Sequence, residues 1–106
     1  MFARFVTMHL KPNYITEFTQ AFDTQVIPLL QKQQGFKDEF TSVGSNGSEA
    51  LSISFWDRKE NAESYGREIY PELLKKLSHI LDGSPQVKTY EVANSTFHKI
   101  PTKATV

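Results

Sequence analysis

The sequence contains no cysteine, a single tryptophan, and no excess of charge of either sign. Without cysteine the chain cannot form disulfides, thiolate zinc sites, iron–sulfur clusters or a cysteine nucleophile. Twelve basic side chains balance twelve acidic ones, so the attraction that carries proteins to nucleic acids or anionic membranes is missing. No apolar run approaches the ~20 residues of a membrane-spanning helix, and the N-terminus lacks a signal-peptide pattern. We therefore expect a cytoplasmic protein that binds neither nucleic acid nor membrane.

The residues that are present suit one small domain with a real core. The chain has 106 residues, of which 39% are hydrophobic and 12% aromatic, and this length is typical of a single domain. We expect one domain over residues 1–95. Residues 96–106 show no clear hydrophobic period, and we interpret them as a C-terminal tail.

Strand-like and helix-like segments alternate along the chain. Alternating or β-favouring composition predicts strands over residues 2–10, 36–43, 49–56 and 86–94. Apolar residues three or four apart predict helices over 13–34 and 57–81. We expect Pro28 to bend the first helix, and Gly66 and Pro71 to interrupt the second. Two split βαβ units predict an α+β, ferredoxin-like fold: a four-stranded antiparallel sheet of order 4-1-3-2 with both helices on one face.

The alternation within the strands divides the sheet into two faces. We expect the helices to cover Leu51, Ile53 and Phe55, together with the more apolar phase of the first strand (Phe2, Val6, Met8 and Leu10). The opposite face then carries Ala3, Phe5, Thr7, His9, Ala50, Ser52, Ser54 and Trp56. Exposed Phe5 and Trp56 would form the kind of apolar patch that marks an interface or a pocket. We therefore predict a homodimer in which two such sheets close a barrel.

Three segments carry a resemblance to a known family: the first strand ending in Lys11-Pro12, VIPLLQKQQGF at 26–36, and SISFWDRKENAESY at 52–65. Over residues 2–95 the chain resembles the antibiotic biosynthesis monooxygenase-like (ABM) family of dimeric α/β barrels. That family includes cofactor-free oxygenases of polycyclic phenols, quinol oxygenases, haem-degrading enzymes and proteins of no known activity. The resemblance implies a monooxygenase that acts on a small aromatic or quinol-type compound without metal or other cofactor. The alternatives are a non-catalytic ligand-binding or structural barrel and, less favoured, a haem-binding or haem-degrading protein.

The haem alternative is disfavoured at three positions. In the haem-degrading branch a histidine of the second helix ligates the iron, and the matching position here is Leu74 or Lys75. Phe5 and Tyr65 stand where that branch has a polar amide and a second tryptophan. His79 lies one turn away, and we interpret it as a solvent-exposed helix residue.

The candidate site residues are aromatic, hydroxyl-bearing or basic. We assign His9 as a general base and Tyr65 as a donor to a developing phenolate. The predicted substrate-binding residues are Phe5, Ser52, Ser54, Trp56 and Tyr70, with Trp56 as a stacking wall and Tyr65 and Tyr70 beside a break that could act as a lid. Each also has a structural interpretation: Trp56 in the dimer interface or under the second helix, His9 as a hydrogen-bonded structural histidine, and the tyrosines in the core. The three histidines lack metal-ligand spacing, so we expect no metal site.

Overall fold

The computed structural model describes residues 1–100 of the chain, and residues 101–106, the end of the predicted tail, lie outside the described residues. The order of strands and helices is the predicted one. The elements are β1 (Phe2–His9), α1 (Ile15–Ala21), the π-helical segment η1 (Phe22–Val26), α2 (Ile27–Gln31), β2 (Phe36–Val43), β3 (Glu49–Trp56), α3 (Lys59–Glu68), α4 (Tyr70–Leu77) and β4 (Gln86–Glu91).

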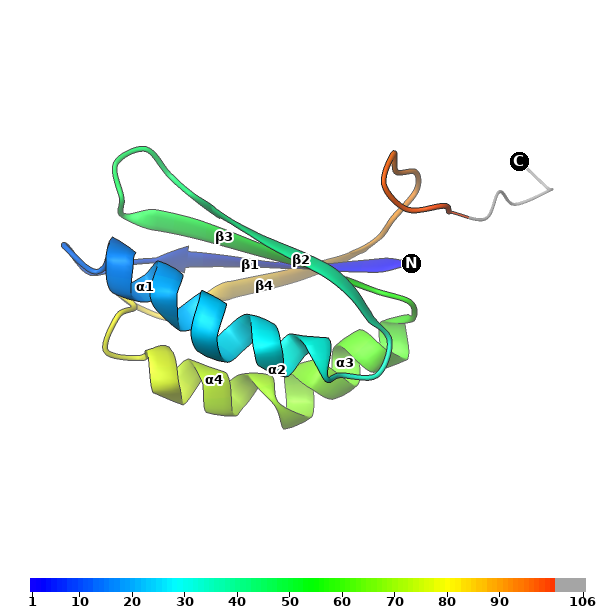
Figure 1. Ribbon diagram of the computed structural model, residues 1–106, viewed down its shortest axis with the longest axis horizontal. Helices are drawn as coiled ribbons and strands as arrows, with labels where there is room; N and C mark the ends of the chain where they lie inside the picture. Colours follow the sequence, from blue (N-terminus) through cyan, green and yellow to red (C-terminus); the bar gives the residue numbers. More distant parts are fainter. Residues whose placement is uncertain (101–106) are drawn as a thin grey trace.

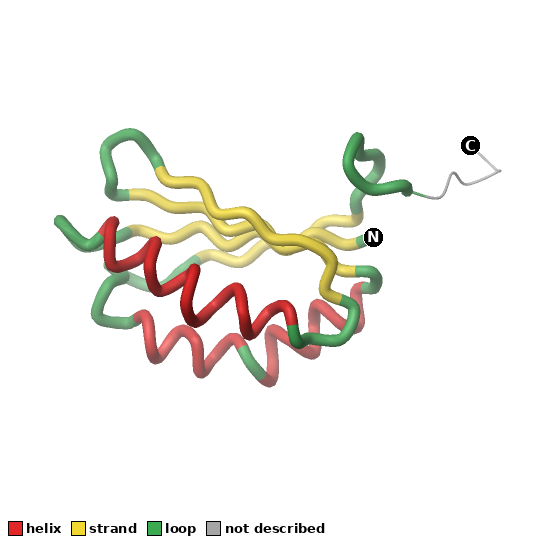
Figure 2. Tube along the Cα trace, in the orientation of Figure 1, coloured by secondary structure: helices red, strands yellow, loops and turns green. Residues whose placement is uncertain are grey.

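The four strands form one antiparallel sheet with the order β2-β3-β1-β4. This is the predicted order, read from the opposite edge. All helices lie in a single layer against one face of the sheet (Figure 1; Figure 2). The ferredoxin-like α+β fold is therefore confirmed. No helix within residues 1–100 combines the length and apolarity needed to cross a membrane.

The first helical region runs without interruption from Ile15 to Gln31 but widens over η1. Pro28 lies in the first turn of α2, directly after the π-helical turn. A proline has no N–H to donate to the preceding turn, and a π turn is one way for a helix to accommodate that loss. The predicted irregularity is therefore present, and it lies on the N-terminal side of Pro28.

The second helical region is divided at Ile69, between α3 and α4 (Figure 2). Ile69 has φ −111°, and Pro71 follows in the first turn of α4. Tyr70 precedes a proline, and this position disfavours regular helix. The prediction that Gly66 interrupts the helix is wrong, because Gly66 lies inside α3. The last helix also ends earlier than predicted, at Leu77, so that His79 lies beyond it.

The prediction of which side of β3 faces the helices is wrong. The inner face, which the helices cover, carries Phe2, Arg4, Val6 and Met8 of β1 opposite Trp56, Ser54, Ser52 and Ala50 of β3. The outer face carries Ala3, Phe5, Leu51, Ile53 and Phe55, which form a separate apolar cluster with Met1 and Val92. Phe5 and Trp56 therefore lie on opposite faces of the sheet. The residues of β1 that face the helices were predicted correctly, except that the prediction left out Arg4.

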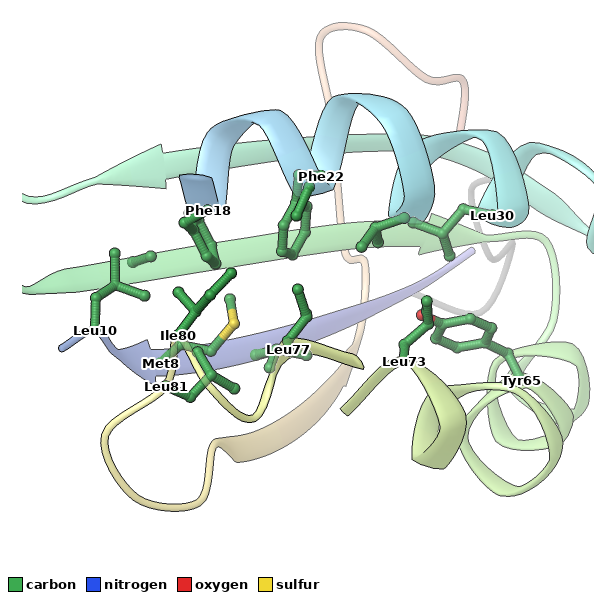
Figure 3. Close-up of a cluster of buried hydrophobic side chains, with 14 of the residues drawn as sticks. Met8, Leu10, Phe18, Phe22, Leu30, Tyr65, Leu73, Leu77, Ile80 and Leu81 are labelled. Carbon is green, nitrogen blue, oxygen red and sulfur yellow. The ribbon is translucent and has the colours of Figure 1, made fainter. Parts of the chain in front are cut away.

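The main core lies between the inner face and the helices (Figure 3). Phe18 and Trp56 are fully buried there, and Ile80 lies at the end of the core where β1 ends, because its carbonyl accepts a hydrogen bond from Lys11 N. Tyr65 extends from α3 into this cluster, toward Leu30 and Leu73 (Figure 3). This burial of apolar surface is what attaches the helices to the sheet.

The described part of the tail lies beside Phe55 on the outer face. The rings of Phe97 and Phe55 meet edge to face with centroids 5.9 Å apart. His98 Nε2 lies 2.5 Å from Asp38 Oδ2, which supplies a partner that the sequence did not indicate for this histidine. The predicted division of the chain at residue 95 stays a prediction.

Candidate functional site

A row of polar residues crosses the inner face of the sheet, where the fold would ordinarily place apolar side chains. Arg4 of β1 pairs with Ser54 of β3, and Ser54 pairs with Glu39 of β2. Two residues earlier in β3, Ser52 pairs with Thr41 of β2. Because directly opposed residues of antiparallel strands share a face, all of these side chains lie under the helices.

Arg4 is the central charge of this row. Its side chain is almost entirely buried, at 6% exposure, and its guanidinium lies 4.2 Å from the ring centroid of Tyr70 and 5.2 Å from that of Tyr65. Within residues 1–100, no carboxylate forms an ion pair with it. Burial lowers the pKa of Arg4 below its ordinary value, although the two phenols act in the opposite direction. A buried cation that is held only by aromatic faces has unused capacity to bind an anion.

Gly66 of α3 lies beside this guanidinium. A Cβ atom at position 66 would lie 3.6 Å from Arg4 Nη2 and 3.7 Å from Arg4 Nε. These are ordinary van der Waals distances, so an alanine would also fit at this position. Gly66 lies within the regular helix α3, and the structure gives no steric reason for a glycine there.

The two tyrosines present phenol groups in a region of low polarity. Burial raises the pKa of Tyr65 to about 12, while the nearby Arg4 acts to lower it. Burial also raises the pKa of Tyr70, again against the effect of Arg4. The Tyr70 hydroxyl is buried and has no hydrogen-bond partner among the described residues. Both phenols are therefore neutral near pH 7 and able to donate a hydrogen bond to a bound oxygen anion.

Trp56 supports the site from below. Its ring is fully buried and lies 5.2 Å from that of Tyr65, centroid to centroid. Its indole Nε1 donates a hydrogen bond of 2.9 Å to Ser54 Oγ. Trp56 therefore positions Ser54 and Tyr65, and it is not among the residues that line the cavity.

A small cavity lies between these polar groups and the helices. Its volume is about 30 Å³, which is enough for a water molecule or two but too small for an aromatic ring. The polar lining residues are Arg4, Ser52, Ser54, Tyr65 and Tyr70, and the apolar ones are Val6, Phe22, Val26, Leu30, Leu73, Leu74 and Leu77. A few convergent polar groups in an apolar enclosure are typical of small-molecule sites. Within residues 1–100, no cluster of His, Asp and Glu has the composition of a metal site.

The structure brings together four of the seven residues proposed from the sequence. Ser52, Ser54, Tyr65 and Tyr70 line the cavity, and Trp56 lies directly beneath it. The other two lie on the outer face: Phe5 packs against Tyr90 with ring centroids 5.3 Å apart, and His9 is exposed at the end of β1, opposite Glu49.

Sequence reasoning missed Arg4 and Glu39. Arg4 has the same strand phase as Phe2, Val6 and Met8, so its position in β1 was a readable signal. Glu39 gave none, because β2 has a mixed composition and a register irregularity between Phe36 and Asp38.

Comparison with known proteins identifies the fold and not the individual family. No family profile matches the chain, and no curated protein matches it. A monooxygenase from Streptomyces coelicolor, solved with the ligand nanaomycin D, superposes with a TM-score of 0.76 at 16% identity, covering 92% of each chain. A candidate antibiotic biosynthesis monooxygenase from Deinococcus radiodurans gives 0.75 at 12% identity, covering 93% of this chain and 99% of its own. A protein of unknown function from Nitrosomonas europaea gives 0.74 at 17% identity, covering 96% and 95%. The chain therefore has the same fold as these proteins.

Proposed function

We propose that the protein is a monooxygenase that oxidises a small aromatic or quinol-type compound without a metal or a bound organic cofactor. The observation that carries this proposal is the buried guanidinium of Arg4, which has two tyrosine rings but no carboxylate beside it in the described part of the chain. A buried charge without an ionic partner is costly. A phenolate oxygen in the cavity would supply the missing negative charge.

The arrangement suits an oxidation that begins with deprotonation. Loss of the phenol proton places electron density on the ring carbons, where dioxygen can react. Conversion of one ring C–H of the phenol to C=O takes up one oxygen atom of O₂ and yields a quinone. The other oxygen atom leaves as water with the ring hydrogen and the phenol hydrogen. Arg4 and the neutral phenols of Tyr65 and Tyr70 would stabilise the anion from which this reaction starts. The apolar walls would keep bulk water from the intermediate.

The cavity must enlarge to admit such a compound. We place the opening at the α3–α4 junction, because Tyr70 and Leu74 are only partly buried there and Pro71 cannot donate a backbone hydrogen bond to the preceding turn. Outward movement of the first turn of α4 would remove the Tyr70 ring from Arg4 and open the cavity toward solvent. Junctions of this kind often act as hinges.

One observation favours the alternative, a barrel that binds or packs without catalysing a reaction. The cavity volume of about 30 Å³ is roughly a tenth of the smallest ordinary ligand pocket. If the junction does not open, the polar row is a feature of the core only. The fold itself supports either function.

We further propose that two copies pack through their outer faces. Leu51, Ile53 and Phe55 point away from the helices, and the rim of this face includes Phe40 at 44% exposure and Tyr90 at 52%. Ile53 and Phe55 are already buried in the single chain, and Phe40 and Tyr90 are the exposed aromatic residues of this face. Exposed apolar side chains on a sheet face are typical of an interface, and a stable interface buries more than about 1,000 Å² in total. Light scattering should give a dimer mass for the wild type at micromolar concentration. Leu51→Lys should dissociate it, whereas Lys75→Glu on α4 should not. A monomeric wild type would contradict the proposal.

The catalytic proposal is tested by oxygen uptake with a panel of phenols and hydroquinones, beside binding measurements with the same compounds. Uptake above the spontaneous rate that is lost in Arg4→Met supports the monooxygenase. Saturable binding without uptake by any compound supports the non-catalytic alternative. Absence of both binding and uptake across the panel would overturn the assignment of the cavity as a ligand site.

A further inference from the structure

Glu39 has an environment that the packing of the fold does not explain. Its Oε2 accepts two hydrogen bonds, one of 2.7 Å from Ser52 Oγ and one of 2.6 Å from Thr41 Oγ1. Its Oε1 is buried and has no partner among the described residues. A carboxylate oxygen that is buried without a donor costs stability. This oxygen therefore has unused capacity to accept a hydrogen bond or a proton.

Glu39 and Ser52 together connect two hollows of the protein. Ser52 lines the cavity that contains Arg4, Tyr65 and Tyr70. Glu39 and Thr41 line a second hollow of about 230 Å³ between β2 and the first helical region, which also includes Asp23. A proton that left the cavity through Ser52 and Glu39 would reach the second hollow without crossing apolar side chains.

The direction of the hydrogen bond suits this transfer. Ser52 donates its only proton to Glu39, so the lone pairs of its oxygen remain available to accept a proton. Arg4 lies on the same face, one strand away from Ser52, and no carboxylate among residues 1–100 forms an ion pair with it. Transfer of a proton from a bound phenol to Glu39 would move one negative charge from the carboxylate to the phenolate beside Arg4.

We infer that Ser52 and Glu39 form a proton outlet for the ligand cavity. The phenol O–H bond breaks as a new O–H bond forms at Ser52 Oγ, and the original Ser52 proton forms an O–H bond with Glu39 Oε2. No electrons are exchanged in this step, which yields a phenolate and a neutral Glu39. Glu39 then releases the proton to solvent through the second hollow. This inference rests on the proposed binding of a phenol, and it gives the role of base to a different residue from His9, which lies on the outer face.

The test uses the full chain and 2-naphthol as the probe. Excitation turns 2-naphthol into a strong acid, and the naphtholate formed by proton transfer emits at a longer wavelength than the neutral molecule. At a pH where the probe is neutral in solution, the ratio of the two emissions from bound probe reports whether the site contains a proton acceptor. This readout requires neither oxygen nor turnover.

We expect naphtholate emission from probe bound to the wild type. Glu39→Gln, which keeps the side-chain shape, should lower the emission ratio by about tenfold or more while the Kd for the probe changes little. Ser52→Ala should lower the emission ratio in the same way, and it provides a second variant if Glu39→Gln fails to fold. Glu49→Gln, at an exposed position at the start of β3, is the matched control and should leave both quantities unchanged.

The outcomes separate this inference from the proposed function. If the wild type does not bind 2-naphthol, the phenol site is refuted and the outlet with it. If the wild type and both variants bind the probe with the same emission ratio, the outlet is refuted and the phenol site stands. Loss of binding in both variants would also refute the outlet, because the pair would then be needed to build the site.

Discussion

Arg4→Met should change stability and ligand binding in opposite directions. Methionine keeps an unbranched side chain of similar reach but removes the charge. In the free protein the guanidinium has lost its hydration, an effect of several kcal/mol. Its two aromatic contacts return about 0.5–2 kcal/mol each. The free energy of unfolding of Arg4→Met should therefore stay equal to that of the wild type or exceed it, by up to about 3 kcal/mol. Each kcal/mol corresponds to a rise in Tm of about 4–8 °C for a chain of this length.

The same substitution should weaken binding of a phenolate. A hydrogen bond to a charged group contributes about 1.5–3 kcal/mol, so the Kd for 4-nitrophenolate should rise roughly 10- to 150-fold. Nitrobenzene, which has a similar ring but no oxygen anion, should lose little affinity. Urea unfolding and equilibrium titration measure the two effects. Arg67→Met is the matched control, because Arg67 is exposed on α3.

Two results would refute this reasoning. A fall of more than about 2 kcal/mol in the free energy of unfolding, which is typical of a broken core contact, would show that the fold needs the charge of Arg4. An equal loss of affinity for 4-nitrophenolate and nitrobenzene would show that Arg4 shapes the cavity without pairing with the anion.

Three further predictions concern the same region. Burial raises the pKa of Tyr65 from 10.0 to about 12, so the folded state holds the phenol proton more tightly than the unfolded state does. The stability that this proton contributes to the fold is complete below about pH 10 and is lost as the pH rises toward 12. In urea unfolding Tyr65→Phe should reduce that alkaline loss by up to about 2–3 kcal/mol, and an equal loss in both proteins would contradict the assignment. Haem should bind weakly and without a histidine-ligated Soret band, because His79 is paired with Glu17 at the surface, with 2.8 Å between His79 Nε2 and Glu17 Oε2. A stoichiometric haem complex that His79→Ala abolishes would overturn this prediction. Gly66→Ala combined with Pro71→Ala should give a more continuous helix by NMR and slower binding of 2-naphthol. The free energy of unfolding should stay the same or rise by about 1 kcal/mol at most. Unchanged binding kinetics with a continuous helix would mean that the junction is not the opening.

The topology could be predicted from the sequence because local patterns determine it. Apolar residues at helical spacing, the alternation of β3, and Gly35 at the end of the first helical region each restrict their own segment. Gly35 has φ +81°, a backbone conformation that favours glycine at a helix end. The order of such segments leaves few ways to connect a four-stranded sheet.

The faces of the sheet could not be predicted in the same way. Alternation in a strand shows which residues share a face, but it does not show which face the helices cover. In β3 the more apolar phase, Leu51, Ile53 and Phe55, points away from the helices. The rule that the more apolar phase lies under the helices fails here because both faces of this strand are largely buried. The assignment of Phe5 and His9 to the site failed with it, since both were placed relative to Trp56.

The inverted pattern of β3 indicates that the inner face is shaped around the cavity and not for maximal packing. Ser52 and Ser54 are small and polar, and they lie where larger apolar side chains would give a denser core. Arg4 and Glu39 add charge to the same surface, at a further cost in stability. Places where a sequence departs from the packing rules of its own fold are expected to be functional sites. Here the departures of β1 and β3 converge on one cavity, and Glu39 of β2 reaches it through its hydrogen bond with Ser52. The compensating apolar side chains lie on the outer face, where a second copy could cover them. Filling the cavity with apolar side chains should therefore stabilise the fold and remove the site. Because the polar row lowers stability in return for a cavity with polar walls, we assign it a function.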